Sequence, residues 1–246
     1  MSIEKVCGQR YLYTPQAKDG SRDWSLEQDL GRLESAAAGY WDSFANGKVD
    51  VSIYETRVQI AEFLAALHLR NKFFYDQFGK AIELRDKLFG GPKFTRRTTD
   101  REGVKPSPDL TCPGSIFAHA TRDGIPKITK TIASYNWTFH HCDERCIDTS
   151  DIPITFFQRK SARRSGPGAK EPMVIFPISP KTLLAMDNTR NGASTAHVDA
   201  DPGLVSDANE VIFTFAERFV ILGSHPSEGL PKPEGTGRLE QPGFGE

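Results

Sequence analysis

Residues 53–89, IYETRVQIAEFLAALHLRNKFFYDQFGKAIELRDKLF, decide the fold of this 246-residue chain. The stretch contains no proline, and Gly79 is its single glycine. A helix spanning all of it would be about 55 Å long. The pattern therefore predicts one continuous helix that serves as the spine of the domain. Its apolar side chains recur mostly at steps of three, four and seven residues, as on one helix face: Ile53, Ile60, Leu64, Leu67, Phe74, Phe78, Ile82 and Phe89.

A second helix is predicted upstream, over residues 26–44. Ser25 and Gln28 have the spacing of a capping box at its start, and Asn46-Gly47 is a typical helix end. Because the spine begins only a few residues later, the two helices should form an antiparallel hairpin.

The pattern changes at residues 90–113, which are rich in glycine, proline and basic side chains. We interpret this segment as a solvated loop. The alternative is an arm that binds phosphate groups, with Arg96 and Arg97 among its binding residues. Residues 115–133 would follow as one or two short helices around Pro126.

Strand patterns fill the second half of the chain. Residues 134–142 alternate aromatic and polar side chains, as in a half-buried strand. Residues 145–149 are predicted to be its hairpin partner, with Ile147 facing Trp137. Further strands are predicted at residues 154–157, 172–178, 182–186 and 218–222, a helix at 204–215, and loops at 159–170 and 187–202.

Helices in the first half and strands in the second predict an α+β fold, in which a long antiparallel helical hairpin packs on a mostly antiparallel sheet. No repeat or linker divides residues 1–222, so we expect a single domain. Residues 223–246 are rich in glycine and proline and are expected to form a disordered tail.

The composition is that of a globular protein, with 38% hydrophobic and 26% charged residues and a formal net charge of -1. This charge does not support nucleic-acid binding, although the local basic segments leave it possible. No stretch approaches the roughly 18 apolar residues of a membrane span. No apolar leader precedes the four cysteines, so we expect a cytoplasmic protein with reduced thiols. The sequence identifies no partner and no cofactor.

The first candidate site lies in Thr149-Ser150-Asp151-Ile152-Pro153, at the end of a predicted strand. A strand end can present a carboxylate to a pocket, which makes Asp151 a candidate catalytic residue and Ser150 a candidate binding residue. The alternative is an Asx or Ser turn that ends the strand.

The second candidate is Arg70, which with His68 interrupts the apolar part of the spine. Residues two apart point about 200° from one another, so these two do not share a face. Arg70 could bind an anionic group, because a guanidinium suits phosphate or carboxylate. Alternatively it forms a structural ion pair with Glu34 or Glu62, since an unpaired buried charge is costly.

The third candidate is the segment His140-His141-Cys142-Asp143-Glu144-Arg145-Cys146. Alternation places His140 and Cys142 on one face of the strand and His141 on the other. No second ligand pair accompanies the two cysteines, as it would in a zinc knuckle. We interpret them as packed thiols and predict no metal site. The chain also lacks the P-loop, Rossmann, α/β-hydrolase and HExxH motifs.

Several segments, taken in order, resemble the bacterial family called domain of unknown function 4238. The most specific is Thr149-Ser150-Asp151-Ile152-Pro153, which matches a Thr-Ser-Asp-Xaa-Pro motif. Two more are Phe176-Pro177-Ile178-Ser179-Pro180 and a closing segment that starts at Asn209 and ends in Ala216-Glu217-Arg218-Phe219-Val220. The resemblance covers roughly residues 9–222 and marks Asn209 as a candidate binding residue. It implies no reaction, because the family is uncharacterised.

The family pattern opens with His-x-x-Pro-x-x-Tyr-Leu ahead of the first long helix. Here Gln9-Arg10-Tyr11-Leu12-Tyr13 matches only the part that follows the histidine. The resemblance therefore implies a truncated or inactive member.

Two functions are compatible with these observations. The favoured one is a non-catalytic domain that binds a ligand or a partner, because no catalytic motif is recognised. The alternative is a metal-dependent phosphodiesterase or nuclease in which Asp151, Arg70 and one of Glu34 or Glu62 converge between the helices and the sheet. The basic loops would then hold the nucleic-acid backbone.

Overall fold

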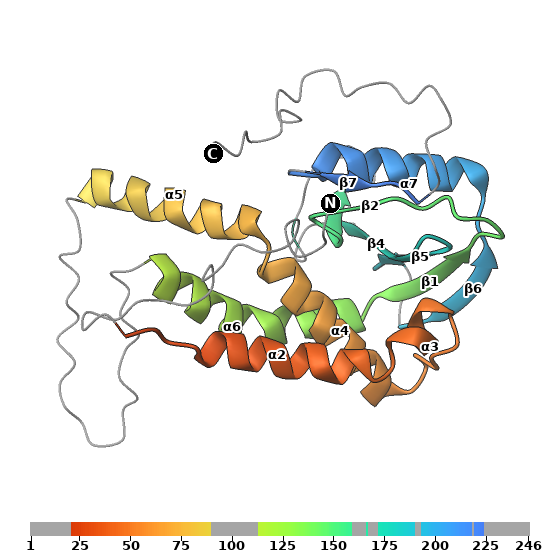
Figure 1. Ribbon diagram of the computed structural model, residues 1–246, viewed down its shortest axis with the longest axis horizontal. Coiled ribbons are helices and arrows are strands. Elements are labelled where there is room, and N and C mark those ends of the chain that lie inside the picture. Colours follow the sequence, from red (N-terminus) through yellow and green to blue (C-terminus); the bar gives the residue numbers. More distant parts are fainter. Residues whose placement is uncertain are drawn as a thin grey trace, which may run out of the picture.

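The computed structural model describes residues 21–89, 113–158, 166, 172–189, 193–217 and 219–223. Its helices are α2 (Ser25–Ala38), α3 (Trp41–Ala45), α4 (Tyr54–Leu69), α5 (Lys72–Phe89), α6 (Pro113–Ala133) and α7 (Pro202–Phe215). Its strands are β1 (Asn136–His141), β2 (Thr149–Ser150), β3 (Thr155–Gln158), β4 (Pro172–Ser179), β5 (Thr182–Asp187), β6 (Thr195–Asp199) and β7 (Val220–Ile221). The predicted α+β class is confirmed (Figure 1).

The main sheet has five strands in the order β3-β4-β5-β1-β6. All neighbours are antiparallel except β1 and β6, which are parallel. The strands predicted at 172–178 and 182–186 are confirmed as β4 and β5, and the two pair as an antiparallel hairpin. The predicted hairpin of β1 with residues 145–149 is wrong, because β1 pairs with β5 and β6 instead. The predicted loop at 187–202 is wrong where β6 forms.

The predicted continuous spine is also wrong, because it divides into α4 and α5. Asn71 lies at the break and bonds to both helices. Its Nδ2 donates to His68 O at 2.8 Å, and its Oδ1 accepts from Phe74 N at 3.0 Å. An asparagine side chain can replace helical backbone bonds in this way, and the apolar period continues across the break.

The first predicted helix divides too, into α2 and α3, around Gly39 and Tyr40. The predicted capping box is wrong, because Ser25 is already helical and Asp23 Oδ1 accepts from Ser25 N at 2.9 Å. Residues 115–133, for which one or two short helices were predicted, belong to the single helix α6, with Pro126 inside it.

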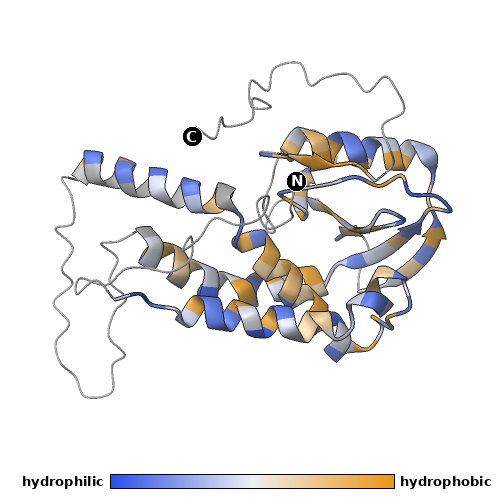
Figure 2. Ribbon diagram, in the orientation of Figure 1, coloured by the Kyte–Doolittle hydropathy of each residue, from blue (hydrophilic) through white to orange (hydrophobic). Residues whose placement is uncertain are grey.

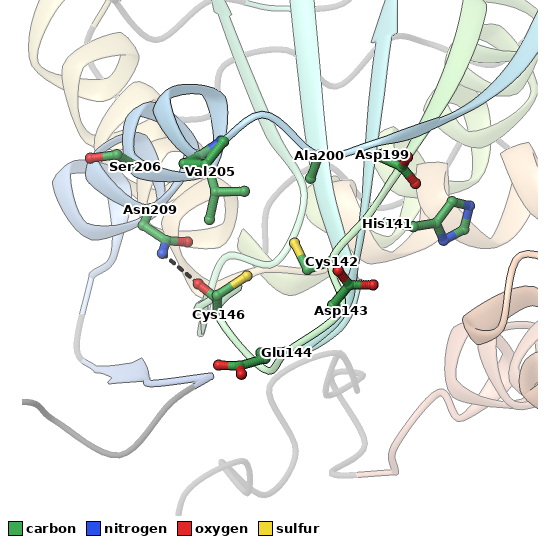
Figure 3. Close-up of a pocket in the computed structure, with 11 residues that line it drawn as sticks. His141, Cys142, Asp143, Glu144, Cys146, Asp199, Ala200, Val205, Ser206 and Asn209 are labelled. Atoms are coloured by element: carbon green, nitrogen blue, oxygen red, sulfur yellow. Dashed lines mark hydrogen bonds between the residues drawn. The ribbon is translucent and has the colours of Figure 1, made fainter.

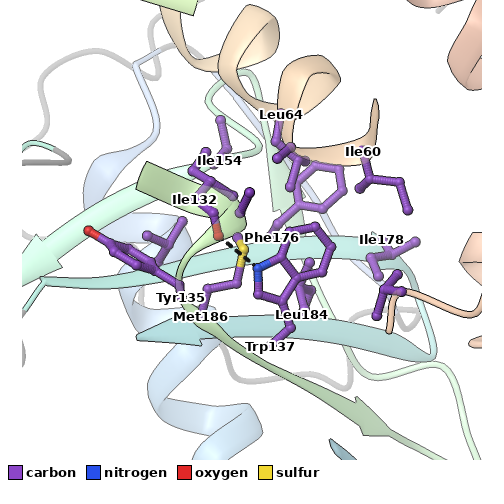
Figure 4. Packing of buried hydrophobic residues seen from close by; sticks show 14 of the residues in the cluster. Ile60, Leu64, Ile132, Tyr135, Trp137, Ile154, Phe176, Ile178, Leu184 and Met186 are labelled. Atoms are coloured by element: carbon purple, nitrogen blue, oxygen red, sulfur yellow. Dashed lines mark hydrogen bonds between the residues drawn. The ribbon is translucent and has the colours of Figure 1, made fainter. Parts of the chain in front are cut away.

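Two apolar cores cover the two faces of the main sheet. Side chains at alternate positions of β4 divide between them: Val174 and Phe176 pack with α4 and α6, whereas Ile175 packs with α7. Figure 4 shows the first core around Trp137, whose Nε1 donates to Ile132 O at 2.9 Å. Figure 2 shows that the apolar side of α7 faces the strands. Trp137 and Ile147 therefore lie in different cores and do not face each other.

One charged residue, Arg57 on α4, is buried in the first core with 4% of its surface exposed. Its guanidinium donates to Ala133 O at 2.8 Å, to Thr195 Oγ1 at 3.0 Å and to Tyr135 O. It also lies 4.5 Å from the centre of the Trp137 ring. A single side chain thus joins α4 to the end of α6, the start of β1 and the start of β6.

Among the described residues, no helix is long and apolar enough to cross a membrane. The predicted basic loop up to Cys112 and the predicted tail after Gly223 lie outside the described residues, as does nearly all of the predicted loop at 159–170. The single domain over residues 1–222 stays a prediction.

We expect Arg57→Met to lower the free energy of unfolding by about 3 kcal/mol or more, because it leaves buried carbonyls without a donor. Arg57→Lys should recover only part of this loss, since an ammonium cannot reproduce the fork of the guanidinium. Urea unfolding measures both. Arg32→Met is the control, because the Arg32 side chain is 78% exposed and should tolerate the change. A loss of under 1 kcal/mol in Arg57→Met would contradict the role of Arg57.

Candidate functional site

Residues 142–148 follow β1, and we call them the 142–148 loop. Hydrogen bonds hold this loop at several of its backbone atoms. Pro180 O accepts from Cys146 N at 2.9 Å and from Ile147 N at 3.1 Å. From α7, Asn209 Nδ2 donates to Cys146 O at 2.8 Å, and Asn209 Oδ1 accepts from Asp148 N at 3.0 Å. Both polar atoms of the Asn209 amide therefore hold this loop.

The end of the loop and the chain that follows it are held by residues 217–223. Asp148 Oδ1 accepts from Gly223 N at 2.9 Å, and β2 pairs with β7. Asp151 Oδ1 accepts from Glu217 N at 3.0 Å. Ser150 Oγ accepts from Ile152 N at 3.2 Å, which is the contact of a Ser turn. The three motif segments of the sequence thus meet around one loop.

The 142–148 loop forms a wall of a cavity of about 520 Å³ beside α7, which we call the acidic cavity (Figure 3). It is lined by His141, Cys142, Asp143, Glu144, Cys146, Asp199, Ala200, Pro202, Val205, Ser206 and Asn209. Its lining includes three carboxylates and no lysine or arginine among the described residues.

A second cavity of about 480 Å³, the basic cavity, shares His141 and Cys142 with the first. Its lining includes Arg145 and Lys181 and no carboxylate among the described residues. Lys181 Nζ donates to Asp143 O, so this cation also supports the loop. The end of β1 therefore separates two cavities of opposite charge.

Burial raises the pKa of the Cys142 thiol to about 12, with further contributions from Cys146 and from the charge of Asp143. At neutral pH this thiol is protonated. Both cysteines are free thiols and pack against the core under α7. Cys142 and His141 were predicted to lie on opposite faces of the strand, and this is confirmed. Cys142 lies on the α7 side of the sheet, and His141 lies beside Gly47 on the other side.

The structure brings together some of the predicted site residues. Arg70, at the end of α4, forms an ion pair with Glu34 on α2, which is the structural alternative considered for it. Glu62 lies near Tyr40, whose pKa is raised by burial and then by this carboxylate. Ser150, Asp151 and Asn209 surround the 142–148 loop. Arg96 and Arg97 lie outside the described residues. The catalytic and binding roles of all these residues stay predictions.

Sequence reasoning missed Asp199, Val205 and Ser206, which line the acidic cavity. Asp199 falls in a segment predicted to be a loop, and the other two fall in a helix whose apolar pattern predicts only packing. Among the described residues, no three or more histidine, cysteine, aspartate or glutamate side chains are arranged as a preformed metal site.

A family model described as "Protein of unknown function (DUF4238)" matches residues 1–226, so the chain belongs to this family. The predicted family is therefore confirmed. Neither the curated proteins nor the solved structures include a match to this chain.

Burial raises the pKa of Asp148 above its ordinary value of 3.8, although the hydrogen bond from Gly223 N acts in the opposite direction. The folded state thus binds this proton more tightly than the unfolded state does. The stability that this contributes is fully present below pH 3.8 and is lost as the pH rises through the folded pKa.

We therefore expect Asp148→Asn to unfold at a higher urea concentration than the parent protein at pH 7, with an advantage that disappears toward pH 3. The asparagine keeps an acceptor oxygen for Gly223 N without a charge in the half-buried site. Asp207→Asn, at an exposed position on α7, is the control and should not change the pH profile. An Asp148→Asn protein that is less stable at pH 7 would refute this assignment.

Proposed function

We propose that this DUF4238 member is a binding protein that takes a small cationic organic ligand into the acidic cavity. The observation that carries the proposal is the network of hydrogen bonds holding the 142–148 loop, because this loop forms a wall of the cavity. A wall fixed before binding lowers the entropy cost of association. The volume of about 520 Å³ is also in the usual range of small-molecule sites, roughly 300–1,000 Å³.

The lining supports a ligand that carries a positive charge and a small apolar group. Asp143, Glu144 and Asp199 supply carboxylates, which attract an ammonium group. Ala200 and Val205 supply apolar surface on the α7 side. An alkyl or aryl amine satisfies both requirements at once.

The state of the thiols supports binding rather than catalysis. A thiolate is the nucleophilic form of cysteine, and the raised pKa of Cys142 keeps that side chain protonated at neutral pH. The free thiols of Cys142 and Cys146 also support a reducing compartment, which favours the cytoplasm.

The contacts of Arg70 and Asp151 favour binding over the phosphodiesterase alternative. To grip a phosphate, Arg70 would have to release Glu34. To join a catalytic centre, Asp151 would have to give up the hydrogen bond from Glu217 N that fastens the closing segment. In the binding protein that we propose, both side chains therefore have a structural role: Arg70 joins α4 to α2, and Asp151 holds the backbone at Glu217.

The test uses two tryptophan substitutions on α7. Ser206 is exposed and lines the acidic cavity, so Ser206→Trp should fill it; its neighbour Asp207 is exposed and does not line it, so Asp207→Trp is the matched control. The parent protein is screened by thermal unfolding against alkyl and aryl amines and against carboxylic acids of the same shapes.

We expect a subset of the amines to raise the melting temperature and the acids not to do so. A ligand at 100 times its dissociation constant stabilises by about 2.7 kcal/mol, which corresponds to a rise of roughly 5–10 °C for a chain of this size. The rise should persist in Asp207→Trp and vanish in Ser206→Trp. Equal rises in the two variants, or a preference for the acids, would refute the proposal.

A further inference from the structure

Two histidines from neighbouring strands meet at the end of the main sheet. His141 Nε2 on β1 lies 3.1 Å from His197 Nδ1 on β6, and the ring planes are within 7° of parallel. We propose that this pair, together with Asp199, binds a divalent first-row transition metal ion. The proposed metal site lies at the rim of the acidic cavity and shares His141 and Asp199 with its lining, but its evidence and its test do not depend on the organic ligand proposed above.

The separation of the two nitrogens fits metal coordination. Two zinc–nitrogen bonds of about 2.0–2.1 Å at a tetrahedral angle place their nitrogens about 3.3 Å apart, close to the 3.1 Å found here.

The pairing of β1 with β6 supplies a third ligand. His141 is in register with Asp199, and Phe139 is in register with His197. Residues two apart on a strand share a face, so all three candidate ligands lie on the same face of the sheet. Figure 3 shows Asp199 and His141 together on the side of the cavity away from Asn209.

The carboxylate of Asp199 is available for this role. It makes no side-chain hydrogen bond or ion pair with any residue that the structure describes. Since three ligands are not preassembled in the described part of the chain, Asp199 must turn toward the two rings when the ion binds. Two histidines and one carboxylate with open positions are a recurrent ligand set for divalent transition metals.

The surroundings hold the two rings in place. His197 stacks on Phe139 with ring centres 4.6 Å apart and planes within 6° of parallel. Phe139 is buried and packs edge-on against Phe44 of α3. Rings that are fixed in position lose little entropy when they bind an ion.

The backbone at Gly47 also adapts to the histidine pair. This glycine has a φ of 64°, and a Cβ on it would lie 2.5 Å from His141 Cε1 and 3.1 Å from His141 Nε2. Any other residue would therefore displace the His141 ring from its position beside His197. The turn after α3 thus leaves room for both rings.

A hydrogen bond between the rings would give the same 3.1 Å separation, so the test must detect the ion itself. The untagged full chain is stripped with a chelator and titrated with cobalt(II) chloride, followed by visible absorption and by calorimetry. We expect one cobalt ion per chain and its displacement by zinc(II). A histidine pair that only shares a proton would bind no cobalt.

Substitutions then assign the ligands. His141→Ala and His197→Ala should each weaken cobalt binding at least 10-fold, and Asp199→Ala should weaken it less. His119→Ala on α6 is the matched control, because His119 lies beside Asp123 and lines neither cavity, and binding should be unchanged. Cys142→Ser is the control for thiol ligation and should also bind normally.

Circular dichroism and melting temperature show whether each variant is folded. If an alanine variant unfolds, the corresponding glutamine variant replaces it, because glutamine keeps much of the side-chain volume without an imidazole nitrogen. The proposal is overturned if the parent protein binds no cobalt or zinc. It is also overturned if folded variants of both histidines bind as tightly as the parent, or if Cys142→Ser abolishes binding.

Discussion

The buried guanidinium of Arg57 is the interaction on which the arrangement of helices and sheet depends. Removing a charge from water costs several kcal/mol, and burial lowers the pKa of Arg57 to about 10, so the group is still charged at neutral pH. The cost is offset by carbonyls at the end of α6 and the start of β1, by Thr195 at the start of β6, and by the face of Trp137. Because Thr195 is two residues before His197, the same guanidinium helps to fix the register that places His197 beside His141.

The elements that could be predicted are those whose neighbouring residues in the sequence show a clear apolar pattern and a turn or cap signal. The β4–β5 hairpin has two apolar runs joined by a short turn, and α7 has a helical period with Asp201 as its cap. The helix breaks could not be predicted from the apolar period, because Asn71 ends one helix and begins the next while the period continues. Strand β6 was missed since its side chains are mostly exposed and its partner β1 is far away in the sequence.

The candidate site also has residues that could be predicted from the sequence and residues that could not. Motif resemblance identified Asn209, Asp151 and Ser150, and the structure places them around one loop. Each of them makes hydrogen bonds to backbone atoms, so a residue in a family motif can serve a site by holding its wall in position. His197 and Asp199 could not be found from the sequence, because their relation to His141 exists only once β1 and β6 pair across 56 residues.

The end of β1 explains why two different kinds of site can lie so close together. Within β1, alternate side chains point to opposite faces of the main sheet. His140 faces the core under α7, and His141 faces the turn after α3. At Cys142 the strand ends, and the backbone turns into a loop held by Pro180, Asn209 and Lys181. The loop carries carboxylates to one side and Arg145 to the other, so a backbone held by these hydrogen bonds separates charges of opposite sign. His141 is the last side chain before this division and lines both cavities, so a change at its imidazole would alter the field in each of them.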